Sequence, residues 1–213
     1  MEANSRAIPE QDKPETVNLL EGRKFAGELR GMADRPFLNS QRYSDQQGRA
    51  LRVGADVDIV EFERRLVGRF KKLGVPLFAH CVRRSGTEQD SLYVRGLSKA
   101  KAGESPHNHG CAVDVVHGTK AWDLTRQQWE IIAHVADEVA RAMGVQIRWG
   151  GDWDGDRSTT RDQWDPAHFE IQNWKERISC EHDFVRYQRD AEGVMQKHTT
   201  ERCLKCRFRG FYH

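Results

Sequence analysis

The sequence SPHNHGCAVDVV, residues 105–116, joins a polar turn to an apolar run that contains one acid. In residues 111–116 the apolar side chains alternate across a predicted strand, and Asp114 lies in the middle of one face. A carboxylate in that position is costly unless it is paired, hydrogen-bonded or bound to a metal. Gly110 allows a sharp turn into the strand, so His107 can reach the carboxylate. We therefore expect a polar site here; the alternative is a strand-end acid that meets an arginine.

The sequence AHFEI, residues 167–171, predicts a second strand with His168 and Glu170 on its polar face. Together with His107 and Asp114, His168 completes a set of three potential metal ligands. Catalytic zinc sites have three protein ligands and leave a fourth position to water. The sequence therefore predicts a zinc site of the catalytic type, and the alternative is three unrelated polar residues.

Two amphipathic helices are predicted where apolar residues recur at three- and four-residue spacing, over residues 56–73 and 125–143. Gly74 and Pro76 favour an end to the first helix after residue 73. Shorter patterns predict strands at 77–82 and 145–149 and a short helix at 87–97. We expect an α+β fold in which a small, mostly antiparallel sheet has these helices packed outside it.

The chain is expected to divide into three parts. Residues 1–54 form a polar N-terminal arm and irregular lead-in, residues 55–175 form the domain that carries the predicted site, and residues 176–213 form a basic C-terminal extension. Within the arm we expect a short helix near residues 17–29, and a loop or irregular strand over residues 36–52.

Composition excludes several classes of protein. The 213 residues carry 34 Lys+Arg and 32 Asp+Glu, a net charge of +2, which argues against a nucleic-acid binder. No apolar run reaches the roughly 18 residues of a membrane span, and the N-terminus has no apolar segment typical of a secretory signal. Five cysteines, an odd number, do not indicate a disulfide framework. We expect a monomer that folds in a reducing cytosol.

The motifs resemble a known family, the zinc D-alanyl-D-alanine carboxypeptidases and L-alanyl-D-glutamate peptidases, which includes phage endolysins and vancomycin-resistance dipeptidases. Residues 105–114 resemble its Ser-x-His-x-x-Gly-x-Ala-x-Asp motif, and residues 149–153 (WGGDW) with 165–170 (DPAHFE) resemble the second half. A segment that begins at Arg84 resembles the substrate-side part. The resemblance covers roughly residues 55–172 and implies the fold shared by Hedgehog domains and D-Ala-D-Ala peptidases.

The resemblance also implies roles for individual residues. His107, Asp114 and His168 take the places of the zinc ligands. Asp165 takes the place of the general base, and Arg84 that of the arginine that binds a substrate carboxylate or stabilises the oxyanion.

Other residues near these motifs have weaker assignments. Ser105 takes the place of a contact to substrate or to the ligands, and His109 falls on a position that the motif leaves free. Glu170 can orient the ring of His168, and it is the competing candidate for the base. Trp153 flanks the site and can line a substrate groove.

The resemblance implies a zinc-dependent peptidoglycan peptidase of the phage endolysin type, which hydrolyses a stem-peptide bond, most often L-alanyl-D-glutamate. The alternatives are a D-Ala-D-Ala dipeptidase or carboxypeptidase of the same family, or a non-catalytic, zinc-containing wall-binding domain. An endolysin would be made in the host cytoplasm and would act in the periplasm or cell wall, with virion association as a further possibility. Its partner would be bacterial peptidoglycan.

An acidic loop offers a second place for a metal ion. Asp152, Asp154, Asp156 and Asp162 supply oxygen ligands that calcium prefers. The glycine is misplaced for an EF-hand and no glutamate closes the loop, which favours a solvated acidic loop.

The C-terminal extension contains Cys203 and Cys206 with His198 and His213 nearby, which could form a structural zinc site. The same stretch, residues 202–209, is basic and suits an anionic envelope surface. The alternative is an exposed tail.

Overall fold

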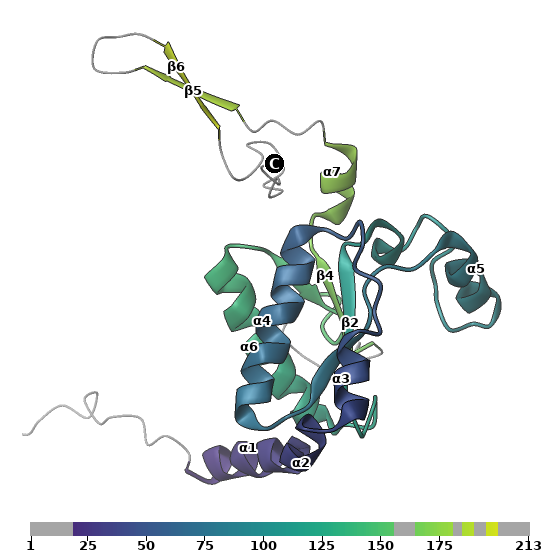
Figure 1. Cartoon of the computed structure of the whole chain (residues 1–213), viewed down its shortest axis with the longest axis vertical. Coiled ribbons are helices and arrows are strands. Elements are labelled where there is room, and N and C mark those ends of the chain that lie inside the picture. The colour runs from purple at the N-terminus through teal and green to yellow at the C-terminus, as the bar shows by residue number, and fades with distance from the viewer. Residues whose placement is uncertain (1–18, 156–164, 181–184, 190–194, 200–213) are drawn as a thin grey trace, which may run out of the picture.

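The computed structural model describes residues 19–155, 165–180, 185–189 and 195–199, with side-chain surroundings for 25–155 and 165–180. Its centre is a four-stranded antiparallel sheet (Figure 1), in the order β1 (Leu77–Cys81), β2 (Ala112–His117), β4 (His168–Ile171), β3 (Ile147–Trp149). Two more strands form a separate antiparallel hairpin, β5 (Val185–Arg189) and β6 (Met195–Thr199).

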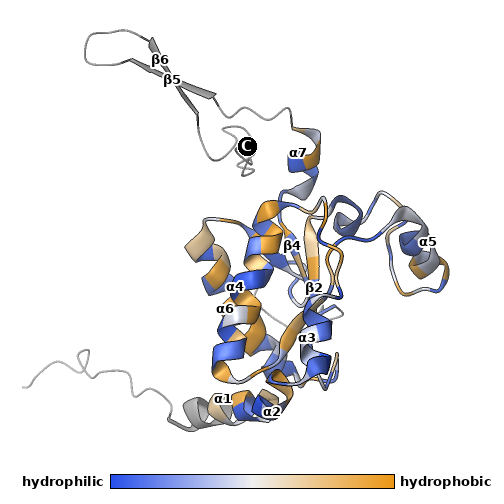
Figure 2. Cartoon of the chain, viewed as in Figure 1, coloured by the Kyte–Doolittle hydropathy of each residue, from blue (hydrophilic) through white to orange (hydrophobic). Residues whose placement is uncertain are grey.

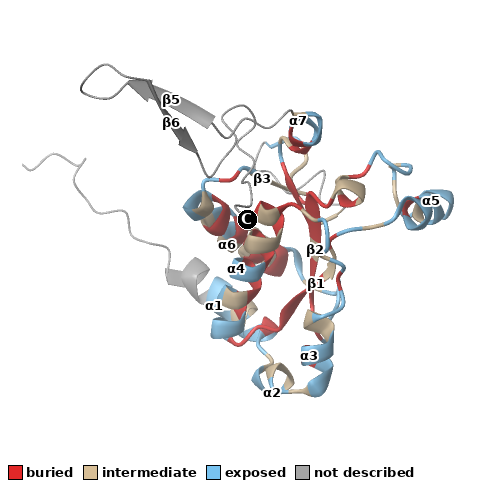
Figure 3. Ribbon diagram, turned by 45° about the horizontal axis from the view of Figure 1, so that its top comes forward, coloured by how far each residue is buried: buried red, intermediate tan, exposed pale blue. Residues whose placement is uncertain are grey.

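Two long helices, α4 (Val57–Leu73) and α6 (Arg126–Met143), pack against each other, and α4 also packs on β1 and β2. Each helix turns an apolar stripe inward (Figure 2), and the buried residues follow the interface between helices and sheet (Figure 3). The Phe62 ring of α4, for example, meets the Phe169 ring of β4 with centroids 5.7 Å apart. Because strand side chains alternate, the neighbours of Phe169 point to the opposite face of the sheet, which the long helices leave free.

The prediction of an α+β fold with a small antiparallel sheet is confirmed. Both long helices begin at the residues that the sequence indicated. Asp56 caps α4 by accepting a hydrogen bond from the backbone N–H of Asp58, and Thr125 forms a capping box with Gln128 at the start of α6. No helix in the described ranges is long and apolar enough to cross a membrane.

The segment before α4 agrees with the prediction in part. The helix expected near residues 17–29 is present as α1 (Leu19–Met32). The chain then forms α2 (Arg35–Leu38) and α3 (Gln41–Gln47), so the predicted loop or irregular strand over residues 36–52 is wrong. Tyr43 is buried, and its hydroxyl donates to the carbonyl of Leu77 at 3.0 Å. Helix α2 starts at the cap residue Asp34 and helix α3 at the cap residue Ser40. Both helices are too short to show a periodic apolar pattern. The division of the chain at residues 54 and 175 stays a prediction.

Three shorter elements surround the free face and the end of the sheet: α5 (Gly86–Val94), the 3₁₀ helix η2 (Pro106–His109) and α7 (Trp174–Ser179). Helix α5 projects from the body of the molecule (Figure 1). Helix α7 is fixed to the N-terminus of α4 by Arg177, which is buried and donates to Asp56 at 3.1 Å and to Asp58 at 2.9 Å.

Candidate metal centre

Strand register brings the two halves of the predicted site together. Asp114 on β2 is the direct cross-strand partner of His168 on β4. His107 comes from η2, which Ser105 caps by accepting a hydrogen bond from the His107 backbone N–H. Gly110 ends η2 with a φ of 66°, a left-handed conformation that suits glycine, and the chain turns directly into β2. The turn therefore carries His107 back over the strand that follows it.

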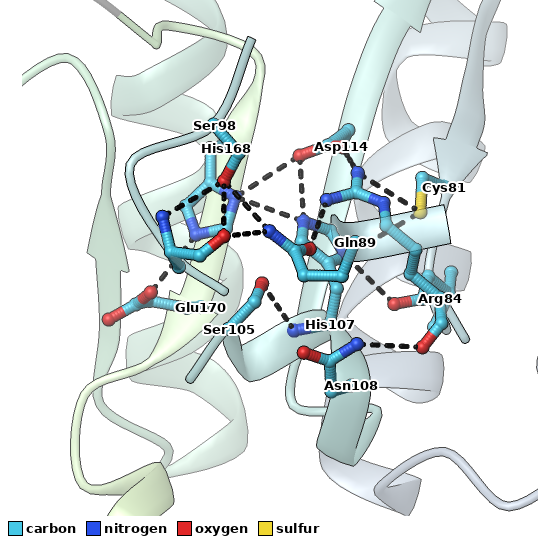
Figure 4. A network of polar contacts seen from close by, with 12 residues as sticks. Cys81, Arg84, Gln89, Ser98, Ser105, His107, Asn108, Asp114, His168 and Glu170 are labelled. Atoms are coloured by element: carbon cyan, nitrogen blue, oxygen red, sulfur yellow. Dashed lines mark hydrogen bonds and ion pairs between the residues drawn. The ribbon is translucent and has the colours of Figure 1, made fainter. Parts of the chain in front are cut away.

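The three predicted ligands meet at one point (Figure 4). Asp114 Oδ1 lies 3.1 Å from His107 Nε2 and 3.1 Å from His168 Nδ1, and the two ring nitrogens are 3.2 Å apart. Tetrahedral zinc with bonds near 2.05 Å holds its ligand atoms roughly 3.3 Å apart. The triangle of donor atoms therefore fits the face of a zinc tetrahedron.

The other nitrogen of each ring fixes where the protons lie. His107 Nδ1 is 2.8 Å from the carbonyl oxygen of Val82, and His168 Nε2 is 3.0 Å from Glu170 Oε2. Both oxygens are acceptors, so these nitrogens carry the protons. In the neutral tautomers the inner nitrogens then turn lone pairs towards Asp114. Three acceptors that face one another require a cation between them, and the site fits a metal ion for that reason.

The pKa values of the ligand residues also indicate that the site favours positive charge. Burial alone would lower the pKa of His107, but the Asp114 carboxylate outweighs it and raises the pKa to about 10. Burial alone would raise the pKa of Asp114, but the two histidines hold it well below its usual range. The Asp114 carboxylate therefore favours positive charge between the two rings, which protons or a metal ion can supply.

Glu170 accepts a hydrogen bond from His168 Nε2, the ring nitrogen that faces away from Asp114, and it also accepts one from Arg148. These two residues are cross-strand partners on β4 and β3, and Arg148 Nε donates to Glu170 Oε1 at 3.0 Å. Burial alone would raise the pKa of Glu170, but hydrogen bonds from His168 and Arg148 lower it. The Arg148 guanidinium also lies over the Trp153 ring, which stacks on His168 with centroids 5.6 Å apart. Both Glu170 oxygens are therefore engaged.

Asp165 has a different environment. Within the described residues its side chain forms no hydrogen bond or ion pair, and burial, with the negative charge of Asp114, raises its pKa. Its backbone is fixed close to Gly150, where a Cβ atom would come within 2.4 Å of the Asp165 carbonyl oxygen. Only glycine allows this close approach, which holds Asp165 beside the entrance to β4.

Arg84 faces the triad from the other side. Its Nη2 lies 3.3 Å from Asp114 Oδ2 and 3.5 Å from Cys81 Sγ, while Gln89 Oε1 accepts from Nη1 at 2.9 Å. Cys81 was missed by the sequence reasoning. Its Sγ lies with ligand atoms of His107 and Asp114 in one cluster that could also hold a metal. Arg84 and Cys81 thus border the side of Asp114 that faces away from His168.

An open cleft of about 900 Å³ contains the triad. All eight residues singled out from the sequence line it: Arg84, Ser105, His107, Asp114, Trp153, Asp165, His168 and Glu170. The structure therefore brings the whole predicted set together, and the roles of the individual residues stay predictions. His109 lies outside the cleft and stacks on Trp174 with centroids 5.3 Å apart.

The remaining metal predictions fall largely beyond the described part of the chain. Asp152 and Asp154 are described, but Asp156 and Asp162 lie outside, so calcium binding stays a prediction. Cys203 and Cys206 also lie outside the described residues. The sequence reasoning also missed Arg148, which holds Glu170. The alternation of side chains in the strand predicted at residues 145–149 was the signal that could have placed it on the polar face.

A family model described as phage L-alanyl-D-glutamate peptidase matches residues 79–172. This segment, less than half of the chain, is therefore similar to that peptidase family. It contains the three candidate ligands, and it also contains Arg84, Asp165 and Glu170. A curated relative, the peptidoglycan L-alanyl-D-glutamate endopeptidase CwlK of Bacillus subtilis (strain 168), is 35% identical, and the match covers 33% of this chain and 49% of the relative. The chain thus spans about half the length of that relative.

Two solved structures are similar to part of this chain. The L-Ala D-Glu endopeptidase ChiX of Serratia marcescens is 26% identical with a TM-score of 0.44, and the match covers 63% of this chain and 94% of that one. The D,D-pentapeptidase VanY from a VanB-type resistance cassette, in complex with Zn(II), is 14% identical with a TM-score of 0.40, and the match covers 58% and 76%.

Proposed function

We propose that this protein is a zinc-dependent peptidoglycan peptidase that hydrolyses the L-alanyl-D-glutamate bond of the stem peptide. One observation carries the proposal: ligand atoms of His107, Asp114 and His168 converge in an open cleft that the Asp165 carboxylate also lines. The same residues lie in the segment that matches the peptidase family model, and the name of the Bacillus relative supports this choice of bond.

His107, Asp114 and His168 would hold the zinc ion through Nε2, Oδ1 and Nδ1. When bound, zinc polarises a carbonyl group and lowers the pKa of a bound water. Asp165, which lines the same cleft, would accept the proton of the attacking water and pass it to the leaving amine. Because Glu170 is bound to both His168 and Arg148, it orients the ligand ring and leaves proton transfer to Asp165.

Arg84 would bind the negative charge of the substrate. Its guanidinium lines the cleft beside Asp114, and Gln89 fixes its orientation. A guanidinium fork binds carboxylates well and stabilises a developing oxyanion. Stem peptides carry free carboxylates, which suits an arginine in this position.

The biological setting that fits best is a phage endolysin, because the matching family model describes phage enzymes. Such an enzyme is synthesised in the host cytoplasm and acts on peptidoglycan in the cell wall. A virion-associated enzyme would use the same cleft.

Digestion of purified peptidoglycan by the zinc-loaded full chain tests the proposal, with released fragments identified by mass spectrometry. New N-terminal D-glutamate ends support it, and release of D-alanine would instead show a D,D-carboxypeptidase. His168→Ala and chelator-treated protein are the matched controls. Wall binding with no cleavage would favour a non-catalytic wall-binding domain and would overturn the proposal.

A further inference from the structure

Two backbone irregularities meet at one wall of the cleft. The register of β1 with β2 shifts between Ala79 and Cys81, and His80 is the extra residue in this bulge. On the turn after β2, Ala121 has a φ of 53°, and it is the one non-glycine residue with positive φ among the described residues. Bulges redirect side chains, and strained backbone often marks functional sites. Here the two irregularities place His80 and Trp122 against each other.

The His80 and Trp122 rings form an edge-to-face pair with centroids 4.7 Å apart and an interplanar angle of 73°. Both rings line the same cleft as the metal triad. Trp122 is 49% exposed, so a large part of its indole is open to a ligand. Tryptophan is a costly residue to leave exposed, because it is one of the largest apolar side chains.

The turn that presents Trp122 is fixed from beneath. His117 is buried, its Nδ1 accepts from the backbone N–H of Lys120 at 3.1 Å, and its Nε2 donates to the Met32 carbonyl at 2.7 Å. His117 and Ala121 also form an isolated β-bridge. Trp122 is therefore held in place before any ligand binds, which lowers the entropic cost of binding.

We propose that His80 and Trp122 form a platform for a sugar ring of the glycan strand, an inference that rests on the proposed peptidase function. The stem peptide consists of small and charged residues and offers no broad apolar face. A pyranose ring presents a face of C–H groups, whose partial positive charge suits the negative face of an indole. In peptidoglycan the sugar is joined to the N-terminal end of the stem peptide.

The position of the platform bears on which bond is cut. Trp122 and the triad share one cleft of about 900 Å³, near the upper end for small-molecule sites. A sugar on Trp122 would place the N-terminal end of the stem peptide in the same cleft as the triad. That arrangement favours a bond close to the glycan, such as L-alanyl-D-glutamate, over the more distant D-Ala-D-Ala bond.

Two matched substrates test the platform: a stem peptide that carries N-acetylmuramic acid and the same peptide without the sugar. For the zinc-loaded full chain, kcat/KM is measured on each by chromatography of the products. We expect the protein to prefer the sugar-bearing substrate, and Trp122→Ala to reduce this preference roughly tenfold. Trp122→Phe should retain most of the preference because it keeps an aromatic face.

Lys120→Ala is the matched control, since Lys120 is exposed on the same turn and does not line the cleft. It should leave the preference unchanged. An unchanged preference in Trp122→Ala, or equal losses on both substrates, would overturn the sugar platform. Cleavage of neither substrate by the unaltered protein would instead contradict the peptidase function itself. Thermal unfolding of each variant separates loss of fold from loss of binding.

Discussion

The two carboxylates beside His168 have different partners, and this difference supports the separate roles proposed for them. Glu170 accepts hydrogen bonds from His168 and Arg148, whereas Asp165 has no side-chain partner within the described residues and faces the cleft. A general base needs a free lone pair directed at the reacting water. An orienting residue needs a fixed bond to the ligand.

Asp165→Asn should retain the zinc and the fold, because the two side chains are nearly isosteric. It should reduce kcat on peptidoglycan by roughly 10²–10⁴-fold, because the amide cannot accept the proton. Turnover with zinc content measured on the same sample checks this. Activity near that of the unaltered protein would remove Asp165 from the reaction.

Glu170→Gln should act mainly on metal affinity. The variant loses the charge that holds the His168 N–H and leaves Arg148 without its partner. We expect zinc affinity to fall about 10–100-fold, the usual effect of removing such a partner. Competition with a chromophoric chelator measures the affinity, with Asp165→Asn as the control that should bind zinc normally. An unchanged affinity with lost turnover would exchange the two roles.

Among the elements, helix α7 depends on a single buried side chain. Arg177→Met removes the buried guanidinium that pairs with Asp56 and Asp58, so the two carboxylates lose this positive charge in a buried position. We expect the free energy of unfolding to fall by about 3–5 kcal/mol. Arg64→Met is the control, because Arg64 forms an exposed pair with Glu61 and should change stability by less than about 1 kcal/mol. Equal effects of the two changes in urea unfolding would contradict this account.

The turn after β2 should make stability depend on pH. Burial lowers the pKa of His117, and its contacts with the Met32 carbonyl and the Lys120 N–H require the neutral ring. The unfolded chain then binds more protons than the folded one, so this contribution is complete above pH 6.5 and is lost as the pH falls through the lowered pKa.

Urea unfolding of His117→Gln across pH 5–8 tests this dependence. The variant should show a smaller loss of stability on acidification than the unaltered protein. His134→Gln serves as the control because His134 is exposed on α6. An identical pH dependence in His117→Gln would contradict the account.

The sequence predicted the elements that carry a pattern of their own, and missed the short helices α2 and α3 and the contacts that depend on strand register. Helices α4 and α6 and strands β2 and β4 follow from alternation and spacing in their own residues. The bulge at His80 could not be predicted, because it exists only in the register between β1 and β2. Likewise the site residues on β2 and β4 were predicted, but the Arg148 contact needed the pairing of β3 with β4.

For the whole molecule, zinc should act as a stabilising ligand. The three acceptors repel one another without a cation, so the folded state binds zinc and the unfolded chain binds it weakly. At zinc concentrations 100 times Kd the gain is about 2.7 kcal/mol, or roughly 5–10 °C in Tm for a chain of this size. Calorimetry with and without zinc measures it. His168→Ala should lose the zinc-induced shift in Tm, and His109→Gln should keep it. If zinc does not raise the Tm of the unaltered protein, the result contradicts zinc binding.

The candidate metal centre lies on a small frame, the paired strands β2 and β4, which are far apart in the sequence. Asp114 and His168 are neighbours across two strands, yet 54 positions separate them along the chain, and that interval contains all of α6 and the loop with Trp153. Trp122 and Trp153, which line the cleft, therefore come from segments that are not part of the strand pair. A change in such segments would alter what the cleft binds and would leave the paired ligands as they are. The frame can be inherited while the preference for substrate evolves around it.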